Sequence, residues 1–175
     1  MDDKETPLDA VLATFLQDDQ LKDVTLQGTD GVQVRANKYV LASRSKVFRQ
    51  MLLGGFSEAE RDVIELEYEG KVLQAVVEYI HTDSAHILNL KKRKEQEDET
   101  RDGSISTLVS LSAAAGFYNL PGLCNKVYDI LKSTTEEEPA LAFQLLAASR
   151  AEGPNVDSDL ADLALTMVRQ RGRTH

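Results

Sequence analysis

The sequence predicts an α+β fold: a small β-sheet of about three strands, flanked by a cluster of α-helices, with extra helices at the C-terminal end. Residues 23–27 and 32–34 flank a turn at Thr29-Asp30-Gly31, which predicts a β-hairpin. Residues 62–68 alternate charged and apolar side chains, the pattern of a third strand with one side in water. Apolar residues three and four positions apart recur in much of the remaining chain and predict helices.

The first predicted helix covers about residues 7–17. Its apolar residues Leu8, Val11, Leu12, Phe15 and Leu16 follow helical spacing and form one stripe. Such a stripe can cover the core of its own chain or the matching stripe of a second copy. The spacing alone leaves both alternatives open.

Directly after the hairpin, one helix is predicted over about residues 38–53. A stop is expected at Gly54-Gly55, because glycine supplies a positive backbone dihedral at a helix end. Its inward face consists of six apolar residues. They are Val40, Leu41, Val47, Phe48, Met51 and Leu52.

After the third strand, apolar spacing predicts a helix over residues 71–80, and residues 86–90 could form a short strand or an extended link. Residues 91–103 hold five basic and five acidic side chains and no apolar one, which predicts a flexible charged loop. The basic run 91–94 could serve as a nuclear localisation signal, although the acidic residues beside it cancel its positive electrostatic potential.

The C-terminal third is predicted to be helical. Helical spacing covers residues 105–112, and Pro121 begins a further helix that residues 134–139 interrupt. Residues 141–148 and 160–168 predict a helical pair joined by a turn at Gly153-Pro154-Asn155.

Composition restricts the class of function. A chain of 175 residues with 42% hydrophobic content can bury one core and carry a short appendage. A net charge of -9 argues against binding nucleic acid or an anionic membrane. The single Cys124 excludes an internal disulfide, and no apolar run suits a signal peptide or a membrane span. A cytoplasmic and/or nuclear protein is expected.

Catalytic and metal-binding patterns have little support in the sequence. The histidines His81 and His86 are five positions apart, which fits neither a helical zinc pair nor a strand face. Gly54-Gly55 lacks the lysine and hydroxyl residue that complete a phosphate-binding loop. We therefore expect a protein that is not an enzyme and needs no cofactor or metal.

Three motifs identify a resemblance. They are Asp23-Val24 at the first strand, the Ala-Asn-Lys-Tyr-Val-Leu-Ala run at 36–42, and Ser45-Lys46-Val47-Phe48. With the helix endings near residues 79–83 and 113–120, they resemble a BTB/POZ domain, a protein-interaction module. Asn37 stands where that family usually has histidine, and His81 and Asp83 stand where it has an aromatic residue and glycine. The resemblance implies a BTB/POZ domain over 23–134 that includes the charged loop.

The resemblance also implies a homodimer. Members of the family pair through the N-terminal helix and the first long helix, so residues 1–22 are expected to form a dimerisation helix. Asp23 and Lys38 correspond to a charged pair near the dimer seam. The expected contact residues are Leu8, Leu12, Phe15, Leu16, Asp23, Lys38, Val40 and Leu41.

The resemblance further implies a scaffold partner. Adaptors of the family that bind cullin-3 carry a hydrophobic-x-Glu motif between the second helix and the third strand, and Phe56-Ser57-Glu58 stands there. Tyr118 is the fourth expected cullin contact. Without the resemblance, a Phe56 ring folded back onto its own core would be the simpler interpretation.

These features lead to a hypothesis and an alternative. The hypothesis is a non-catalytic adaptor that bridges a cullin-3 type ubiquitin ligase to an unknown substrate protein. The alternative is an oligomerisation or scaffold module in transcription or signalling that binds no cullin. Residues 135–175 resemble the start of the helical BACK region, and they could equally be a plain helical extension.

Overall fold

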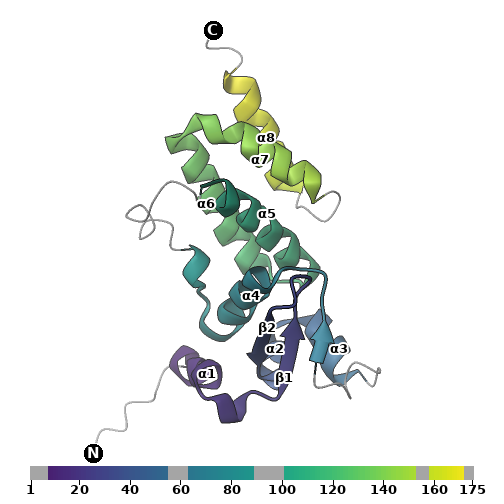
Figure 1. Ribbon diagram of the computed structural model, residues 1–175. Coiled ribbons are helices and arrows are strands. Elements are labelled where there is room, and N and C mark those ends of the chain that lie inside the picture. Colours follow the sequence, from purple (N-terminus) through teal and green to yellow (C-terminus); the bar gives the residue numbers. More distant parts are fainter. Residues whose placement is uncertain (1–7, 55–62, 89–100, 153–157, 172–175) are drawn as a thin grey trace, which may run out of the picture. The chain divides into compact units, whose positions relative to one another are not determined.

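The computed structural model describes residues 8–54, 63–88, 101–152 and 158–171 (Figure 1). The chain divides into two compact units, Met1–Ile87 and Leu88–His175. The first unit contains the sheet together with its helices, and the second is helical.

The sheet of the first unit has three strands in the order β2-β1-β3. Strand β1 (Val24–Gln27) pairs antiparallel with β2 (Gln33–Ala36) and parallel with β3 (Val63–Glu65). The predicted hairpin and the three-stranded sheet are confirmed, and the third strand is shorter than the predicted 62–68. One side of the sheet is buried and the other is polar. The buried side chains are Val24, Leu26, Val34, Ala36 and Ile64.

The hairpin turn is tied to the helix that follows the sheet. Gly31 has a φ of 77°, a conformation that glycine adopts without strain. Asp30 Oδ1 accepts hydrogen bonds from the backbone N–H of Val32 (3.2 Å) and of Gly70 (3.0 Å), where helix α4 (Gly70–Thr82) begins. The bond from Gly70, the largest influence, lowers the pKa of Asp30. The turn therefore fixes the start of α4.

The long helix predicted over 38–53 is two helices, α2 (Lys38–Arg44) and α3 (Lys46–Leu53). Ser45 separates them: its backbone is extended (φ -127°, ψ 123°) and its hydroxyl accepts a hydrogen bond from Phe48 N. A side-chain cap of this kind satisfies an amide at the start of α3. Gly54 ends α3 with φ -81°, so the predicted positive dihedral is wrong for that residue.

Asn37 holds the start of α2. Its side-chain oxygen accepts hydrogen bonds from Tyr39 N (3.0 Å) and Val40 N (3.1 Å), and its amide donates to Leu21 O (2.6 Å). The residue is buried. Asparagine thus caps the helix and also ties it to the turn η1 (Asp19–Leu21).

Replacing Asn37 with alanine is expected to lower the free energy of unfolding by about 2 kcal/mol, because both the cap and the buried bond to Leu21 are lost. Asn37→Ser keeps a neutral capping oxygen and loses the amide donor, so it should cost less than alanine. Urea denaturation measures both. Equal losses in the two variants would show that the cap contributes nothing.

Helices α1 (Leu8–Gln17) and α4 agree with the predicted helices, and they pack against each other. Helix α4 ends at Asp83, whose φ of 54° is left-handed and whose N–H donates to Tyr79 O. The Arg44 guanidinium pairs with the Asp83 carboxylate and donates to Ile80 O. The strand or extended link expected at 86–90 is wrong for its first part, which is the 3-10 helix η3 (His86–Leu88).

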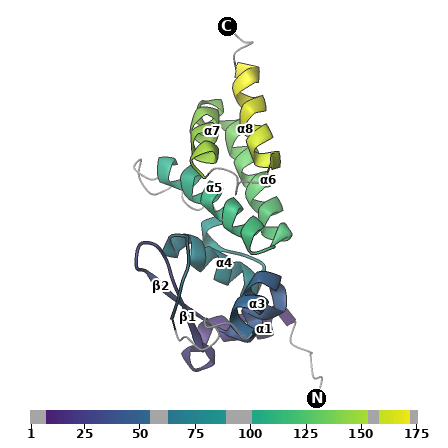
Figure 2. The ribbon, with the colours of Figure 1, turned by 90° about the vertical axis from the view of Figure 1, so that its right-hand side faces the viewer.

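The second unit consists, in its described part, of α5 (Arg101–Phe117), α6 (Pro121–Glu137), the 3-10 turn η5 (Pro139–Leu141), α7 (Ala142–Ala151) and α8 (Ser158–Arg171). Helix α5 packs against α6 and α7, and α8 packs against α6 and α7 (Figure 2). The four helices therefore close a ring of contacts. Fully buried leucines such as Leu123, Leu131, Leu145 and Leu160 form its core.

Two predicted boundaries in this unit are corrected. Helix α5 begins at Arg101, so the last residues of the predicted charged loop 91–103 are helical, and 91–100 lie outside the described residues. Helix α6 continues through Glu137, where an interruption from residue 134 was expected. Thr135 is buried and its hydroxyl donates to Leu131 O (2.8 Å), which accommodates a threonine inside the helix. The predicted turn at 153–155 lies outside the described residues.

Candidate protein-interaction site

The apolar stripe of α1 is partly covered by its own chain. Helix α1 packs against α4, and the side chains of Leu12, Phe15 and Leu16 are half-buried. Val11 on the same helix is 40% exposed. The side chain of the predicted contact Leu8 lies outside the described ones. The stripe therefore contacts its own chain and still keeps apolar surface for a second one.

Asp23 and Lys38 lie together, as the resemblance implies for this pair. The Lys38 ammonium is 4.0 Å from Asp23 Oδ2, and the Lys38 backbone N–H donates to Asp23 Oδ1 at 2.8 Å. Asp23 is exposed and Lys38 is half-buried. The carboxylate thus orients the first turn of α2 and remains accessible at the surface.

Val40 and Leu41 face the interior of their own chain. Their exposed fractions are 6% and 0%, and α2 packs against α4. Side chains packed in the core of their own chain leave little surface for a partner, and the dimer contacts expected at these two positions stay a prediction. The exposed side chain on this turn is Tyr39, at 61%, with the Lys38 ammonium 5.5 Å from its ring centre. The sequence signal for Tyr39 was its place directly after the cationic Lys38 and directly before two inward-facing residues.

The predicted cullin contacts Phe56, Ser57 and Glu58 lie outside the described residues. Helix α3 ends before them at Leu53, and β3 begins after them at Val63. The side chains of Leu53 and Val63 are 46% and 39% exposed. Apolar surface therefore borders both ends of this segment, and neither residue had been singled out from the sequence.

Tyr118, the fourth predicted cullin contact, is 1% exposed. Its ring packs edge to face with that of Phe117, with 5.1 Å between the ring centres and 86° between the planes. Phe117 is 54% exposed. The tyrosine is thus a core residue of its own chain, its neighbour presents the exposed aromatic surface, and its contact with a cullin stays a prediction.

Charged side chains near α1 and α4 pair within the first unit. Lys22 lies 2.7 Å from Asp19, and this hydrogen bond, the largest influence, lowers the pKa of the Asp19 carboxyl. Burial raises the pKa of Glu78, but hydrogen bonds from Gln74 and His86 outweigh burial and lower it overall. These ion pairs and hydrogen bonds are all formed within the first unit.

The described residues offer little for catalysis. Within them, no three His, Cys, Asp or Glu side chains gather closely enough to hold a metal ion. A shallow, open depression lies where β1 and β3 end, with Gln27, Thr29, Glu65 and Glu67 among its lining residues. Over the same part of the chain, no helix has the length and apolarity to cross a lipid bilayer.

Comparison with known proteins gives a consistent result. A sequence model described as BTB/POZ domain matches residues 12–135. "BTB/POZ and MATH domain-containing protein 6" of Arabidopsis thaliana is 34% identical over 114 residues, which cover 57% of this chain and 26% of that protein. "Kelch-like protein 28" of Homo sapiens is 39% identical over 72 residues, covering 41% of this chain and 12% of that protein.

A solved structure, "BTB domain of zebrafish PATZ1", aligns with a TM-score of 0.49 and 18% identity, and the alignment covers 70% of this chain and 86% of that one. The matches to the curated relatives span about a quarter of their length or less. What those longer proteins do as a whole is therefore carried to this chain only as a proposal.

Proposed function

Because the chain belongs to the BTB/POZ domain family, we propose that it is a non-catalytic adaptor that pairs with its own copy and bridges a cullin-3 type scaffold to a substrate protein. The match over residues 12–135 carries the proposal, and BTB/POZ domains are protein-interaction modules. In this proposal the chemistry of ubiquitin transfer belongs to the recruited ligase. The substrate remains an unidentified protein.

Self-pairing is supported by the α1 surface. Leu12, Phe15 and Leu16 are half-buried against α4, so the same stripe retains apolar area. Two identical stripes that face each other across a two-fold axis would cover that area, which is the usual geometry of a homodimer. Asp23 and Lys38 are already paired within one chain and lie at the start of α2.

Cullin binding is supported by the sequence between α3 and β3. Phe56 supplies an aromatic ring and Glu58 a carboxylate, two residues apart and directly after the paired glycines. A ring inserted into a pocket with a charge at its rim is a common arrangement at protein interfaces. The exposed Leu53 and Val63 would extend this apolar surface on either side.

A scaffold module that binds no cullin is the second candidate. The burial of Tyr118, at 1% exposure, favours it, because this side chain offers little surface to a cullin. Such a module would assemble a transcriptional or signalling complex through its dimer. The two candidates differ in one property, which is affinity for cullin-3.

Titration calorimetry with the N-terminal region of cullin-3 tests the proposal. Phe56→Ala is expected to weaken binding about thirtyfold, the equivalent of a hot-spot residue of about 2 kcal/mol, and Glu58→Lys should weaken it further by reversing a charge. Phe143→Ala is the matched control, because Phe143 is an exposed phenylalanine (54%) on α7. No affinity in the unaltered chain, or none lost in the variants, would favour the scaffold module.

A further inference from the structure

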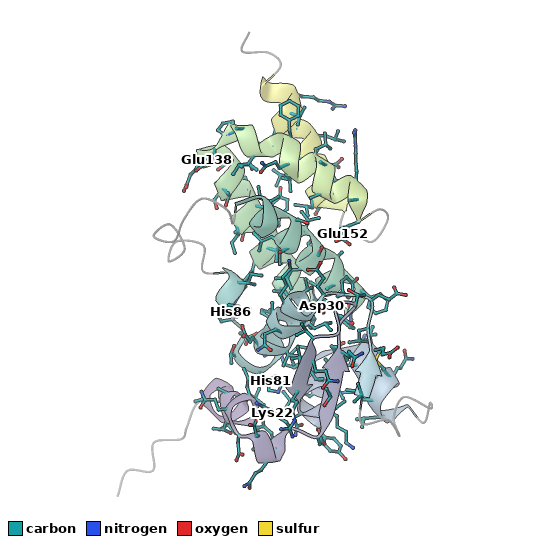
Figure 3. All side chains as sticks on the ribbon, viewed as in Figure 1. Lys22, Asp30, His81, His86, Glu138 and Glu152 are labelled. Atoms are coloured by element: carbon teal, nitrogen blue, oxygen red, sulfur yellow. The ribbon has the colours of Figure 1, made fainter. Side chains whose placement is uncertain are left out.

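The histidine at the end of helix α4 has no role in the proposed interaction surfaces. His81 is 0% exposed. We propose that His81 is a proton-sensitive latch: its neutral imidazole permits the segment around Lys22 and helix α2 to pack on the end of α4, and protonation loosens that packing. Figure 3 labels His81 and Lys22 in the first unit.

The hydrogen bonds of the ring define its neutral form. His81 Nδ1 lies 2.8 Å from Val77 O. A carbonyl can only accept, so Nδ1 carries the proton and Nε2 carries the lone pair. Among the described residues, Nε2 is buried and has no hydrogen-bond partner. A second proton would therefore create a buried N–H without an acceptor, which is costly in a site closed to water.

Two cations act on the same ring from two different elements. Lys22 follows the turn η1, and its ammonium is bound to Asp19. Arg44 is the last residue of α2, and its guanidinium is bound to Asp83. Burial, the largest influence, lowers the pKa of His81; the bond to Val77 O opposes it, and the charges of Lys22 and Arg44 lower the pKa further.

The other charged groups on the elements packed against α4 are held at the surface. Helix α1, helix α2 and strand β2 pack on α4. Lys38 of α2 pairs with Asp23, and Arg35 of β2 lies 4.0 Å from Asp19. On α4 itself, Glu78 accepts hydrogen bonds from Gln74 and contacts His86. Each of these carboxylates already has a partner, so none replaces the missing acceptor at Nε2.

The direction of the pH effect follows from the depressed pKa. A histidine in the unfolded chain binds its proton near the ordinary value of 6.5, and folded His81 binds it only at lower pH. Between those two values the unfolded state holds the extra proton, so the stabilisation present above pH 6.5 is lost as pH falls. The unfolding equilibrium constant should rise by up to about tenfold per pH unit in that window.

The test uses the full chain with His86→Gln and His175→Gln, which leaves His81 as the one imidazole. Its ring is titrated by NMR, and urea denaturation is repeated at several values between about pH 7.5 and 5.5, above the range in which carboxyls with lowered pKa titrate. We expect a ring that protonates below 6.5 and a stability that falls with pH. Hydrogen exchange of residues 8–22 should quicken together with this loss.

His81→Phe supplies the comparison, because phenylalanine keeps a ring of similar shape and cannot be protonated. Made in the chain with His86→Gln and His175→Gln, this variant should lose most of the pH dependence between pH 7.5 and 5.5. A His81 ring that titrates at 6.5 or above overturns the latch. An unchanged slope in His81→Phe does the same, and if that variant fails to fold, the ring titration of the double variant decides.

Discussion

Replacing Phe15 with aspartate is expected to convert the proposed dimer of this chain into a monomer. Phe15 lies in the stripe of α1 that is half-buried against α4 and that we propose to pair with a second copy. An aspartate there would bring two unpaired carboxylates into an apolar interface, at a cost of several kcal/mol that a small dimer cannot offset. Sedimentation velocity should show one species near 19.4 kDa in place of one about twice that mass.

Ala10→Asp is the matched control for this variant. It adds the same charge to the same helix, but residue 10 lies about 140° around the helix axis from residue 15, and Ala10 is exposed. This control should remain dimeric. If both variants dissociate, or if neither does, the stripe containing Phe15 is not the dimer surface. Circular dichroism must show the same helix content in both variants for the comparison to hold.

The second large effect is expected at the core of the first unit. Phe48 has no exposed surface, and it lies in the first turn of α3, where its N–H donates to Ser45 Oγ. Phe48→Ala should lower the free energy of unfolding by about 3–5 kcal/mol, because the lost ring leaves a cavity. Since small domains are stable by only about 5–15 kcal/mol, this unit would be close to unfolding.

Leu53→Ala at the other end of α3 is the control for Phe48→Ala. Leu53 is 46% exposed, so its truncation should cost well under about 1 kcal/mol in urea denaturation. The contrast separates core packing from helix propensity, since both variants place alanine in the same helix. Equal costs would mean that α3 does not rest on the core through Phe48.

The hairpin, α1 and α4 could be predicted because each has a periodic pattern that survives in the structure. The break at Ser45 could not, because one extended residue between two short helices leaves the apolar spacing almost intact. Leu41 and Phe48 are seven residues apart, close to two helical turns, and both are fully buried. The serine hydroxyl that caps α3 is the signal that could have shown the break.

The sites were harder to predict than the fold, because a family resemblance indicates which residue occupies a contact position but does not show whether its side chain is exposed. Val40 and Leu41 were placed on the inward face of a helix by their spacing and on the dimer surface by the resemblance. In the structure both side chains are buried in the core of their own chain. Tyr118 was placed by the resemblance alone; its side chain is buried, and the exposed ring next to it is Phe117. An inward-facing periodicity is therefore evidence against a contact role at the same position.

His81 shows the opposite limit. Its isolation from other metal ligands along the chain gave no reason to consider it further as a site. Its chemistry depends on the Val77 carbonyl at Nδ1, on the absence of a partner for Nε2 among the described residues, and on the charges of Lys22 and Arg44, which lower the pKa of His81. Val77 is four residues away on the same helix, but Lys22 and Arg44 come from segments far apart in the sequence, so no local pattern predicts their influence.

The most direct test of the adaptor proposal is the mass of the complex with the N-terminal region of cullin-3, measured by size-exclusion chromatography with light scattering. The proposal predicts one complex that contains two copies of this chain and two of the cullin region. Without the cullin region, this chain should elute as a dimer of about 39 kDa, twice 19.4 kDa. A chain that elutes separately from the cullin region, with the mass of a single copy, would contradict it.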